Sequence, residues 1–428
     1  MITGAGGWQM LAAVLAALLA FTVPAGDPPP TPTPEGERAL AELRPATALA
    51  PGVTHRGLTT TAAAGQVMGD VVEVDLTDPA VHADLLTPGA IAARSPVAAM
   101  ADGSGAIAAI NGDFFDIGQT NAPTGPAVQD GRPLKAAVPQ GRRMGPAVPG
   151  AETEHVFTVG ADRIARIDRL RLEAQVQTPT GTVPAVALNQ YAVPVGGIGI
   201  FTPEWGDVDR GATLCGTDVD RNAPCAAEQA EVLVRDDAVV ASGAPAGGRI
   251  PDGTLALTGR EEGAAVLRSL EVGDPVDVSY ELVPESGEEP EFAVGGSPIL
   301  RDGELVAGLD DGARAPRSAV GNSADGRHVW LLTLDGRQSD SVGATLRELA
   351  TLLDELGVDD AVNLDGGGSS TLVHQAADAG PVTIVNDPSD PSPRLVPNGI
   401  GIYRTSPDRA ADPDRRSGTA ERSRGGGE

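Results

Sequence analysis

Two aspartates in the C-terminal third of the chain each follow an apolar run. Asp335 comes after residues 328–334 and Asp365 after residues 361–364, and each aspartate is preceded by leucine and followed by glycine. If both runs are parallel strands joined by a helix, their ends lie at one edge of the same sheet. Adjacent strands lie about 4.8 Å apart, and strands with one between them about 10 Å. Either spacing would let two carboxylates act on one glycosidic bond.

A single Asp-Gly pair more often marks a turn, because the aspartate side chain readily caps its own turn. Here the pattern occurs twice, with Arg337 close after Asp335 and Asn363 two residues before Asp365. This repetition favours an active site over two unrelated turns.

Two arginines could bind an anion at the same edge. Arg337 follows the first aspartate, and Arg317 opens the strand that precedes it. A guanidinium matches the oxygens of a phosphate. In a chain with 31 basic and 59 acidic residues, an anionic substrate needs such a local cationic patch. The alternative for each arginine is an ion pair with a nearby carboxylate.

A glycine-rich bend follows the second aspartate. Gly366 and Gly367 lead towards Ser369, with no lysine and no helix pattern after them, which excludes a P-loop and a dinucleotide fingerprint. Such a bend can direct several N–H groups at an anion. A tight hairpin that needs positive φ is the alternative.

Two asparagines are candidate ligands for sugar hydroxyls. Asn111 emerges from a buried-type strand over residues 106–110, and Asn363 lies in the strand before Asp365. For Asn111 a turn-capping role is the alternative.

The segment between the two aspartates has the pattern of an amphipathic helix. Thr345 and Glu348 have the spacing of a capping box, and leucines recur at helical intervals until Gly357 supplies a stop. Residues 66–76 alternate and predict a strand. Short alternating strands over about residues 151–289 predict a β-rich insertion.

These patterns predict a mixed β-sheet core with packed helices and a β-rich middle region. The expected organisation begins with a signal peptide over residues 1–26 and a Pro/Ala-rich linker over 27–64. One domain over 65–404 and a disordered tail over 405–428 follow.

The N-terminus and the cysteines indicate the compartment. Residues 10–23 form an apolar run of signal-peptide length, which predicts a secreted protein with no stable membrane span after cleavage. An uncleaved anchor is the alternative, because no basic residue precedes the run. Cys215 and Cys225 are ten residues apart, and in an exported chain we expect one local disulfide. The formal charge of −28 argues against a nucleic-acid partner.

Several segments together resemble the phosphodiester glycosidase family. They are INGDFFD (110–116), GGSPIL (295–300), PRSAVG (316–321), LDGR (334–337), TLRELA (345–350), NLDGGGSST (363–371), NDPSD (386–390) and PNGIG (397–401). The resemblance implies an α+β fold and hydrolysis of a sugar α-linked through phosphate to an alcohol. Asp113 stands where the family more often has glycine, so it receives no catalytic role.

The resulting hypothesis is a hydrolase that needs no cofactor and no metal. The two aspartates would act at the anomeric centre and on water, and the two arginines would hold the phosphate. The two asparagines and the glycine-rich bend would bind the rest of the substrate, a sugar phosphodiester or a cell-envelope glycan. Two alternatives remain open: a metal-dependent phosphodiesterase that cuts P–O, and a glycan-binding protein without turnover.

Overall fold

The described chain is built mostly from β-strands. The computed structural model describes residues 41–376 and 380–405. Three α-helices occur in this part of the chain: α1 (Val97–Ser104), α2 (Glu262–Arg268) and α3 (Leu346–Glu355). The expected α+β fold is therefore confirmed in part: helices and sheets are both present, but the fold is mostly β.

The first of four sheets carries the candidate site. Its strands are β1 (Glu42–Leu43), β2 (Thr47–Ala50), β3 (Val53–Ala62), β4 (Gly65–Asp75), β19 (Ser297–Arg301), β20 (Glu304–Leu305), β21 (Arg317–Asn322), β22 (His328–Leu334) and β23 (Asp360–Asn363). Their order is β1-β3-β4-β22-β21-β23-β19-β20, and β2 pairs with β3.

The other three sheets have seven, five and five strands. The second contains β7 (Ala127–Gln129), β8 (Arg132–Lys135), β9 (His155–Gly160), β10 (Ala165–Thr178), β11 (Gly181–Pro184), β17 (Asp277–Pro284) and β18 (Pro290–Gly295). The third contains β12 (Ala187–Leu188), β13 (Ile198–Phe201), β14 (Gln229–Arg235), β15 (Ala238–Gly243) and β16 (Thr254–Arg260). The fourth contains β5 (Val81–Leu86), β6 (Ala108–Asn111), β24 (Leu372–Gln375), β25 (Val382–Ile384) and β26 (Gly399–Arg404).

The sheets are almost entirely antiparallel, whereas the sequence predicted a core sheet of mixed parallel and antiparallel strands. Among the strands of the described residues, β12 and β13 form the one parallel pair. Many neighbouring strands, such as β3 and β4 or β14 and β15, are joined by short turns, which connect antiparallel partners without a crossover helix. This connectivity explains why the chain needs so few helices.

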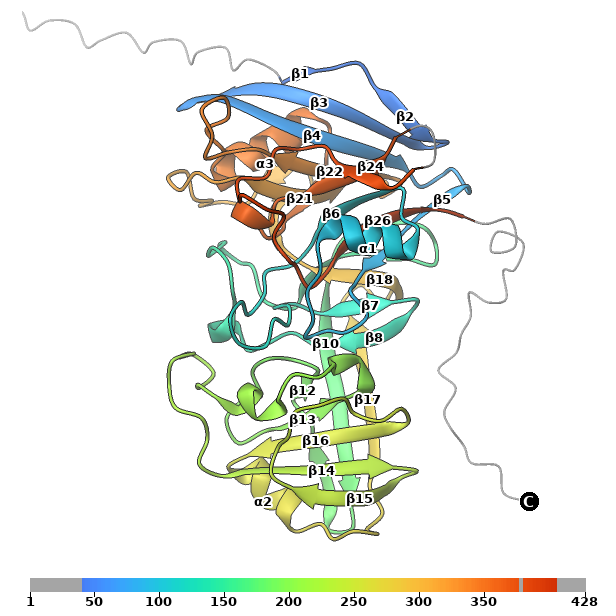
Figure 1. Cartoon of the computed structure of the whole chain (residues 1–428), viewed down its shortest axis with the longest axis vertical. Coiled ribbons are helices and arrows are strands. Elements are labelled where there is room, and N and C mark those ends of the chain that lie inside the picture. The colour runs from blue at the N-terminus through green and yellow to red at the C-terminus, as the bar shows by residue number, and fades with distance from the viewer. Residues whose placement is uncertain (1–40, 377–379, 406–428) are drawn as a thin grey trace, which may run out of the picture. The chain divides into compact units, whose positions relative to one another are not determined.

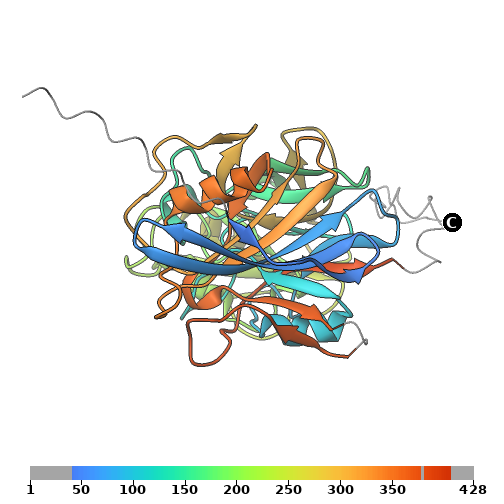
Figure 2. The same cartoon turned by 90° about the horizontal axis from the view of Figure 1, so that it is seen from above.

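The part of the molecule that carries the candidate site is built from four stacked layers. The inner faces of the first and fourth sheets share one apolar core, to which Val72, Leu331 and Ile110 contribute. Helix α3 covers the other face of the first sheet, where Leu349 and Ala361 belong to one apolar cluster. Helix α1 packs on the other face of the fourth sheet (Figure 2). Burial of these faces is the main force that holds the layers together.

Helix α3 begins as the sequence predicts. The hydroxyl of Thr345 accepts a hydrogen bond from the Glu348 N–H (3.1 Å), and the Glu348 carboxylate accepts one from the Thr345 N–H (3.0 Å). The predicted capping box is therefore confirmed. The helix ends at Glu355, and Gly357 then has φ +84°, a left-handed conformation that favours glycine. The helix thus connects β22 to β23.

The N-terminal part of the described chain differs from the predicted linker. Residues 53–62 lie inside the expected linker over 27–64, yet they form β3 and pair with β4 along its length. The threonines of this strand have high β-propensity, and Val53 and Leu58 are fully buried. The linker was predicted because residues 27–64 as a whole are rich in proline and alanine.

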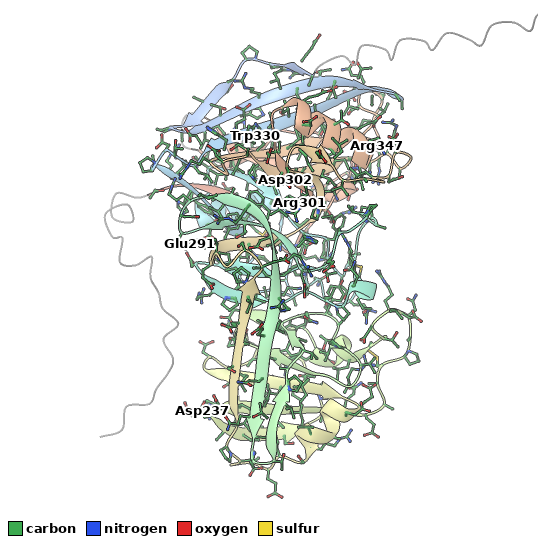
Figure 3. All side chains as sticks on the ribbon, turned by 180° about the vertical axis from the view of Figure 1, so that it is seen from behind. Asp237, Glu291, Arg301, Asp302, Trp330 and Arg347 are labelled. Atoms are coloured by element: carbon green, nitrogen blue, oxygen red, sulfur yellow. A yellow bond between two sulfur atoms is a disulfide. The ribbon has the colours of Figure 1, made fainter. Side chains whose placement is uncertain are left out.

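Residues 151–289 contribute the strands from β9 to β17. Strands β10 and β17 are long antiparallel partners that lie side by side in Figures 1 and 3. β9 pairs with β18, so the second sheet continues beyond this range. The predicted disulfide between Cys215 and Cys225 is present.

Two predicted segments cannot be compared with the structure. The signal peptide over residues 1–26 and the tail beyond residue 405 lie outside the described residues. Within the described residues, no helix is both long enough and apolar enough to cross a bilayer.

Candidate active site

The strands that precede the two aspartates end at the same edge of the first sheet. Leu334, the last residue of β22, pairs with Arg317 in β21. Asn363, the last residue of β23, pairs with Ala319 in the same strand. Because β21 pairs antiparallel with both, β22 and β23 run parallel to each other with β21 between them. This is the arrangement in which the two strands lie about 10 Å apart.

Asp335 is buried at this edge and accepts two hydrogen bonds. Its Oδ1 accepts from the main-chain N–H of Asp387 (2.9 Å) and from Nδ2 of Asn386 (3.3 Å). Burial raises the pKa of Asp335 to about 7; the negative charges of Asp70 and Asp387 add to this, and the two hydrogen bonds oppose it. The carboxyl can therefore exchange a proton near neutral pH.

Asp365 is tied to the chain through both its main chain and its carboxylate. Its N–H donates to the Gly112 carbonyl (2.9 Å), and its Oδ2 accepts from Ser369 Oγ (2.6 Å). Burial raises the pKa of Asp365 to about 7; Ser369 and Arg394 oppose this, and the charge of Asp113 adds to it. The residue as a whole is half-buried and keeps some solvent contact.

Asn386 joins the loops that carry the two aspartates. Its Nδ2 donates to the Ser370 carbonyl (3.1 Å) as well as to Asp335, and its Oδ1 accepts from the Leu372 N–H (2.8 Å). Ser370 directly follows the serine that binds the Asp365 carboxylate. Asp335 and Asp365 therefore belong to one hydrogen-bonded unit.

The glycine-rich bend is tightly enclosed by two other loops. Gly367 has φ +62°, and a Cβ at this position would lie 3.2 Å from the guanidinium of Arg337. A Cβ at Gly368 would collide with the side chains of Asp390 and Arg394. The glycines thus let two arginines approach the main chain next to Asp365.

The two predicted arginines have different surroundings. Arg337 is exposed, and its guanidinium makes no hydrogen bond or ion pair within residues 41–376 and 380–405. Arg317 is buried, and it donates from Nε to the Ala344 carbonyl (2.9 Å) and from Nη2 to the Ala313 carbonyl (2.7 Å). Burial also lowers the pKa of Arg317. Of the two, Arg337 is the one whose side chain is exposed to solvent.

The two predicted asparagines are both fully buried. Asn111 donates from Nδ2 to the Asp365 carbonyl (2.7 Å), and its Oδ1 accepts from Ser318 Oγ (2.7 Å) and the Thr371 N–H (3.1 Å). Through these partners Asn111 holds the main chain beside Asp365, and its predicted contact with a sugar stays a prediction. The Asn363 amide makes no hydrogen bond within the described residues.

Four residues of the loop between β25 and β26 contribute to the site, although they were not among the site residues predicted from the sequence. They are Asn386, Asp387, Asp390 and Arg394. Arg394 donates from Nε and Nη2 to Asp390 Oδ2 (3.0 and 2.8 Å), and its Nη1 lies 3.4 Å from Ser369 Oγ. The first three belong to the NDPSD segment of the resemblance, which was a usable signal. For Arg394 the only signal was its position as the single cation in a proline-rich loop.

The aspartates of the site do not gather into a metal-binding set among the described residues. The one group of three ligand atoms within 4.8 Å of one another in residues 41–376 and 380–405 belongs to Asp302, Asp359 and Asp360. Asp360 begins β23, so this group lies at the end of the strand opposite to the site; Asp302 is labelled in Figure 3. The metal-dependent alternative gains no ligand set from these residues.

The fold and the site define a mostly β protein with two buried carboxyl groups and an exposed arginine at one sheet edge. Residues 228–403 match the family model described as phosphodiester glycosidase. The resemblance predicted from the motifs is therefore confirmed for the part of the chain that carries both aspartates and both arginines.

Comparisons with individual proteins extend over different shares of the chain. The SPbeta prophage-derived uncharacterized protein YomE of Bacillus subtilis (strain 168) is 33% identical over 141 residues, which cover 32% of this chain and 20% of that protein. A hypothetical protein from Synechocystis has a TM-score of 0.67 and 21% identity, covering 85% of this chain and 64% of the other. A protein of Burkholderia pseudomallei K96243 named as exported has a TM-score of 0.66 and 19% identity, covering 88% and 99%.

The two solved structures show that the fold is shared. Their sequence identity to this chain is low, so they support no conclusion beyond the fold. The chain matches about a fifth of the length of the Bacillus subtilis protein and less than two thirds of the Synechocystis chain. Their names describe no reaction, so the activity has to be argued from the site.

Proposed function

We propose that this protein hydrolyses the glycosidic C–O bond of a sugar-1-phosphodiester and releases the free sugar and a phosphomonoester. One observation carries the proposal. Two carboxyl groups whose pKa values are raised to about 7 lie at the same sheet edge as an exposed arginine that has no partner among the described residues. The family match over residues 228–403 supports the same reaction class.

The two carboxyl groups would transfer protons. A pKa near the working pH is the best compromise for a group that must both hold and release a proton. In the proposed reaction the C1–O bond breaks and its electron pair leaves with the phosphate oxygen, which takes a proton from one carboxyl. The other carboxylate takes a proton from water, and the water oxygen becomes the hydroxyl group of the free sugar.

Arg337 would hold the phosphate. The leaving phosphomonoester gains negative charge as the bond breaks, so a cation that contacts it stabilises the transition state more than the ground state. Arg394 shares its charge with Asp390 and would contribute less. In this proposal Arg317 supports the loops around Ala313 and Ala344, and a contact of Asn363 with the sugar stays a prediction.

The disulfide between Cys215 and Cys225 supports placing this activity outside the cytoplasm, because such bonds persist in oxidising compartments. We therefore propose a secreted enzyme that acts on an extracellular or cell-envelope substrate.

Hydrolysis in oxygen-18 water tests the proposal. The purified chain is incubated with a panel of sugar-1-phosphodiesters, and the products are analysed by mass spectrometry, with the Asp335→Asn/Asp365→Asn double variant as the control. Label in the released sugar supports C–O cleavage. Label in the phosphate indicates a P–O-cutting phosphodiesterase, and binding without any product indicates a glycan-binding protein. Both of these outcomes contradict the proposal, and loss of activity with a chelator would favour the metal-dependent alternative.

A further inference from the structure

The only lysine of this 428-residue chain is buried. Lys135 donates from Nζ to three main-chain carbonyls, those of Thr124 (3.1 Å), Gly125 (2.8 Å) and Ala136 (2.6 Å). An ammonium group has three N–H donors and satisfies all three carbonyls, whereas a neutral amine has two donors and would turn its lone pair towards an oxygen. This arrangement therefore selects the charged form of Lys135.

Asp113 and Lys135 both hydrogen-bond to Gly125, and no hydrogen bond or ion pair joins them directly within residues 41–376 and 380–405. The Asp113 Oδ2 accepts a hydrogen bond from the Gly125 N–H (2.5 Å), and a Cβ on Gly125 or Gly295 would press against its carboxylate. The absence of a side chain at Gly125 and Gly295 thus leaves room for this carboxyl group. Burial raises the pKa of Asp113, and the Gly125 N–H, Lys135 and Arg143 all oppose that shift by favouring the carboxylate. Burial lowers the pKa of Lys135 to about 7, and the charge of Asp113 opposes this.

The main chain next to Asp113 contacts one of the two site aspartates. The N–H of Asp365 donates to the carbonyl of Gly112 (2.9 Å), the residue before Asp113. The negative charge of Asp113 favours the protonated form of Asp365, whereas Ser369 and Arg394, on the other side, favour its ionised form. A negative charge on one carboxyl disfavours ionisation of another carboxyl near it.

We infer that Asp113 is a third carboxyl group of this site, which Lys135 keeps ionised and whose negative charge holds a proton on Asp365. Asp365 is then the carboxyl from which the departing phosphate oxygen takes its proton; this last step rests on the proposed function. Asp113 acts through Asp365 and is a positioning residue. Besides these groups, the titratable side chains that face Asp113 are Arg143 and Tyr191.

A single lysine allows the pair to be tested without any substrate. Labelling the chain with lysine enriched in nitrogen-15 at its side-chain nitrogen gives one amine NMR signal, whose titration reports the charge of Lys135 directly. We expect a midpoint below the value of about 10.4 for a free lysine, because burial disfavours the charge, yet high enough that Lys135 is charged at the pH of activity, because three carbonyls and Asp113 favour it. Asp113→Asn should lower the midpoint further, because the attracting carboxylate is lost. Asp207→Asn, an exposed control, should leave it unchanged.

Either of two results would overturn the pair. One is a midpoint below the pH of activity in the unmodified chain, because Lys135 would then be uncharged and could not keep Asp113 ionised; this result decides the matter even if Asp113→Asn does not fold. The other is a midpoint that Asp113→Asn leaves unchanged.

The effect on Asp365 is measured as a pH profile of kcat/KM, with the phosphodiester that the oxygen-18 experiment identifies. Asp113→Asn should move the limb that Asp365 controls to lower pH by about one unit, the scale of a neighbouring charge. A lower rate with an unchanged profile would show a purely structural role and overturn the inference about Asp365. If the unmodified chain turns over no substrate, the proposed function fails, and the lysine titration still decides the Asp113–Lys135 pair.

Discussion

Asn111 donates a hydrogen bond of 2.7 Å from its Nδ2 to the main-chain carbonyl of Asp365, across 254 positions of sequence. Asn111 ends β6 in the fourth sheet, and Asp365 follows β23 in the first. The bond therefore fixes the candidate active site at the junction of two sheets that pack face to face. Stability and catalysis should be coupled at this point.

Replacing Asn111 by alanine should lower both thermal stability and activity. The change leaves the Asp365 carbonyl, the Thr371 N–H and the Ser318 hydroxyl without these partners, and each unsatisfied buried group costs about 1–3 kcal/mol. We expect a fall in Tm of several degrees, measured by circular dichroism. Asn222→Ala, at an exposed position, is the control. An unchanged Tm with a raised KM would instead indicate that Asn111 contacts the sugar.

Asp335→Asn and Asp365→Asn should each lower kcat/KM for a sugar-1-phosphodiester by at least about 100-fold, the usual scale for a lost acid or base. Both substitutions preserve shape and remove a carboxyl that burial holds near pKa 7. The folded state should therefore survive, which thermal unfolding checks. Asp207→Asn serves as the exposed control. Rates close to wild type in both variants would refute the assignment of the two aspartates.

The same carboxyl groups predict how stability depends on pH. Their pKa is raised to about 7 in the folded state and is about 3.9 in the unfolded chain. Between these values the folded state binds more protons, so the stability they contribute is present at the acidic end and is lost as the pH rises to 7. Each group accounts for at most about 4 kcal/mol across this window.

Urea unfolding at several pH values in this window tests the prediction. The unfolding free energy of the unmodified chain should decrease more steeply between about pH 4 and 7 than that of the Asp335→Asn/Asp365→Asn double variant. Equal slopes would mean that the two carboxyls titrate normally in the folded state. The comparison needs no substrate, so it is independent of the proposed reaction.

The sequence predicted the layout of the site better than the roles within it. Apolar runs that end in Asp-Gly, and a capped helix between them, are local patterns, so the two strand ends and α3 could be located. Arg317 donates to a main-chain carbonyl 27 residues away, and Asn111 donates to one 254 residues away. A local sequence pattern does not predict contacts over such separations. Arg317 and Asn111 thus contact main-chain carbonyls that the sequence could not indicate, and their roles in binding phosphate and sugar stay predictions.

The sheet order was equally beyond local reasoning. Whether β21 lies between β22 and β23 depends on long-range pairing, which apolar periodicity does not specify. The same limit concealed β3, a threonine-rich segment that forms a strand by pairing with β4. The proportion of strand was underestimated for the same reason, because each strand that the sequence did not reveal makes the fold more β-rich.

Arg337 is the residue whose removal should weaken phosphate binding without weakening the fold. Its guanidinium is exposed and has no partner within the described residues, so Arg337→Ala should leave Tm unchanged. A hydrogen bond to a charged group contributes about 1.5–3 kcal/mol, which predicts a fall in kcat/KM of about 10- to 100-fold. Inhibition by the phosphomonoester product should weaken in parallel.

Two further variants show whether geometry or charge matters at this position. Arg337→Lys keeps the charge but loses the planar fork, so its activity should fall between wild type and Arg337→Ala. Arg347→Ala is the control, because Arg347 lies on α3 (Figure 3), with a solvent-facing ion pair to Asp311 at 3.7 Å. If Arg337→Ala retained full activity and product inhibition, the phosphate would have to be held elsewhere. Arg394, beside Ser369, would then be the cation to replace next.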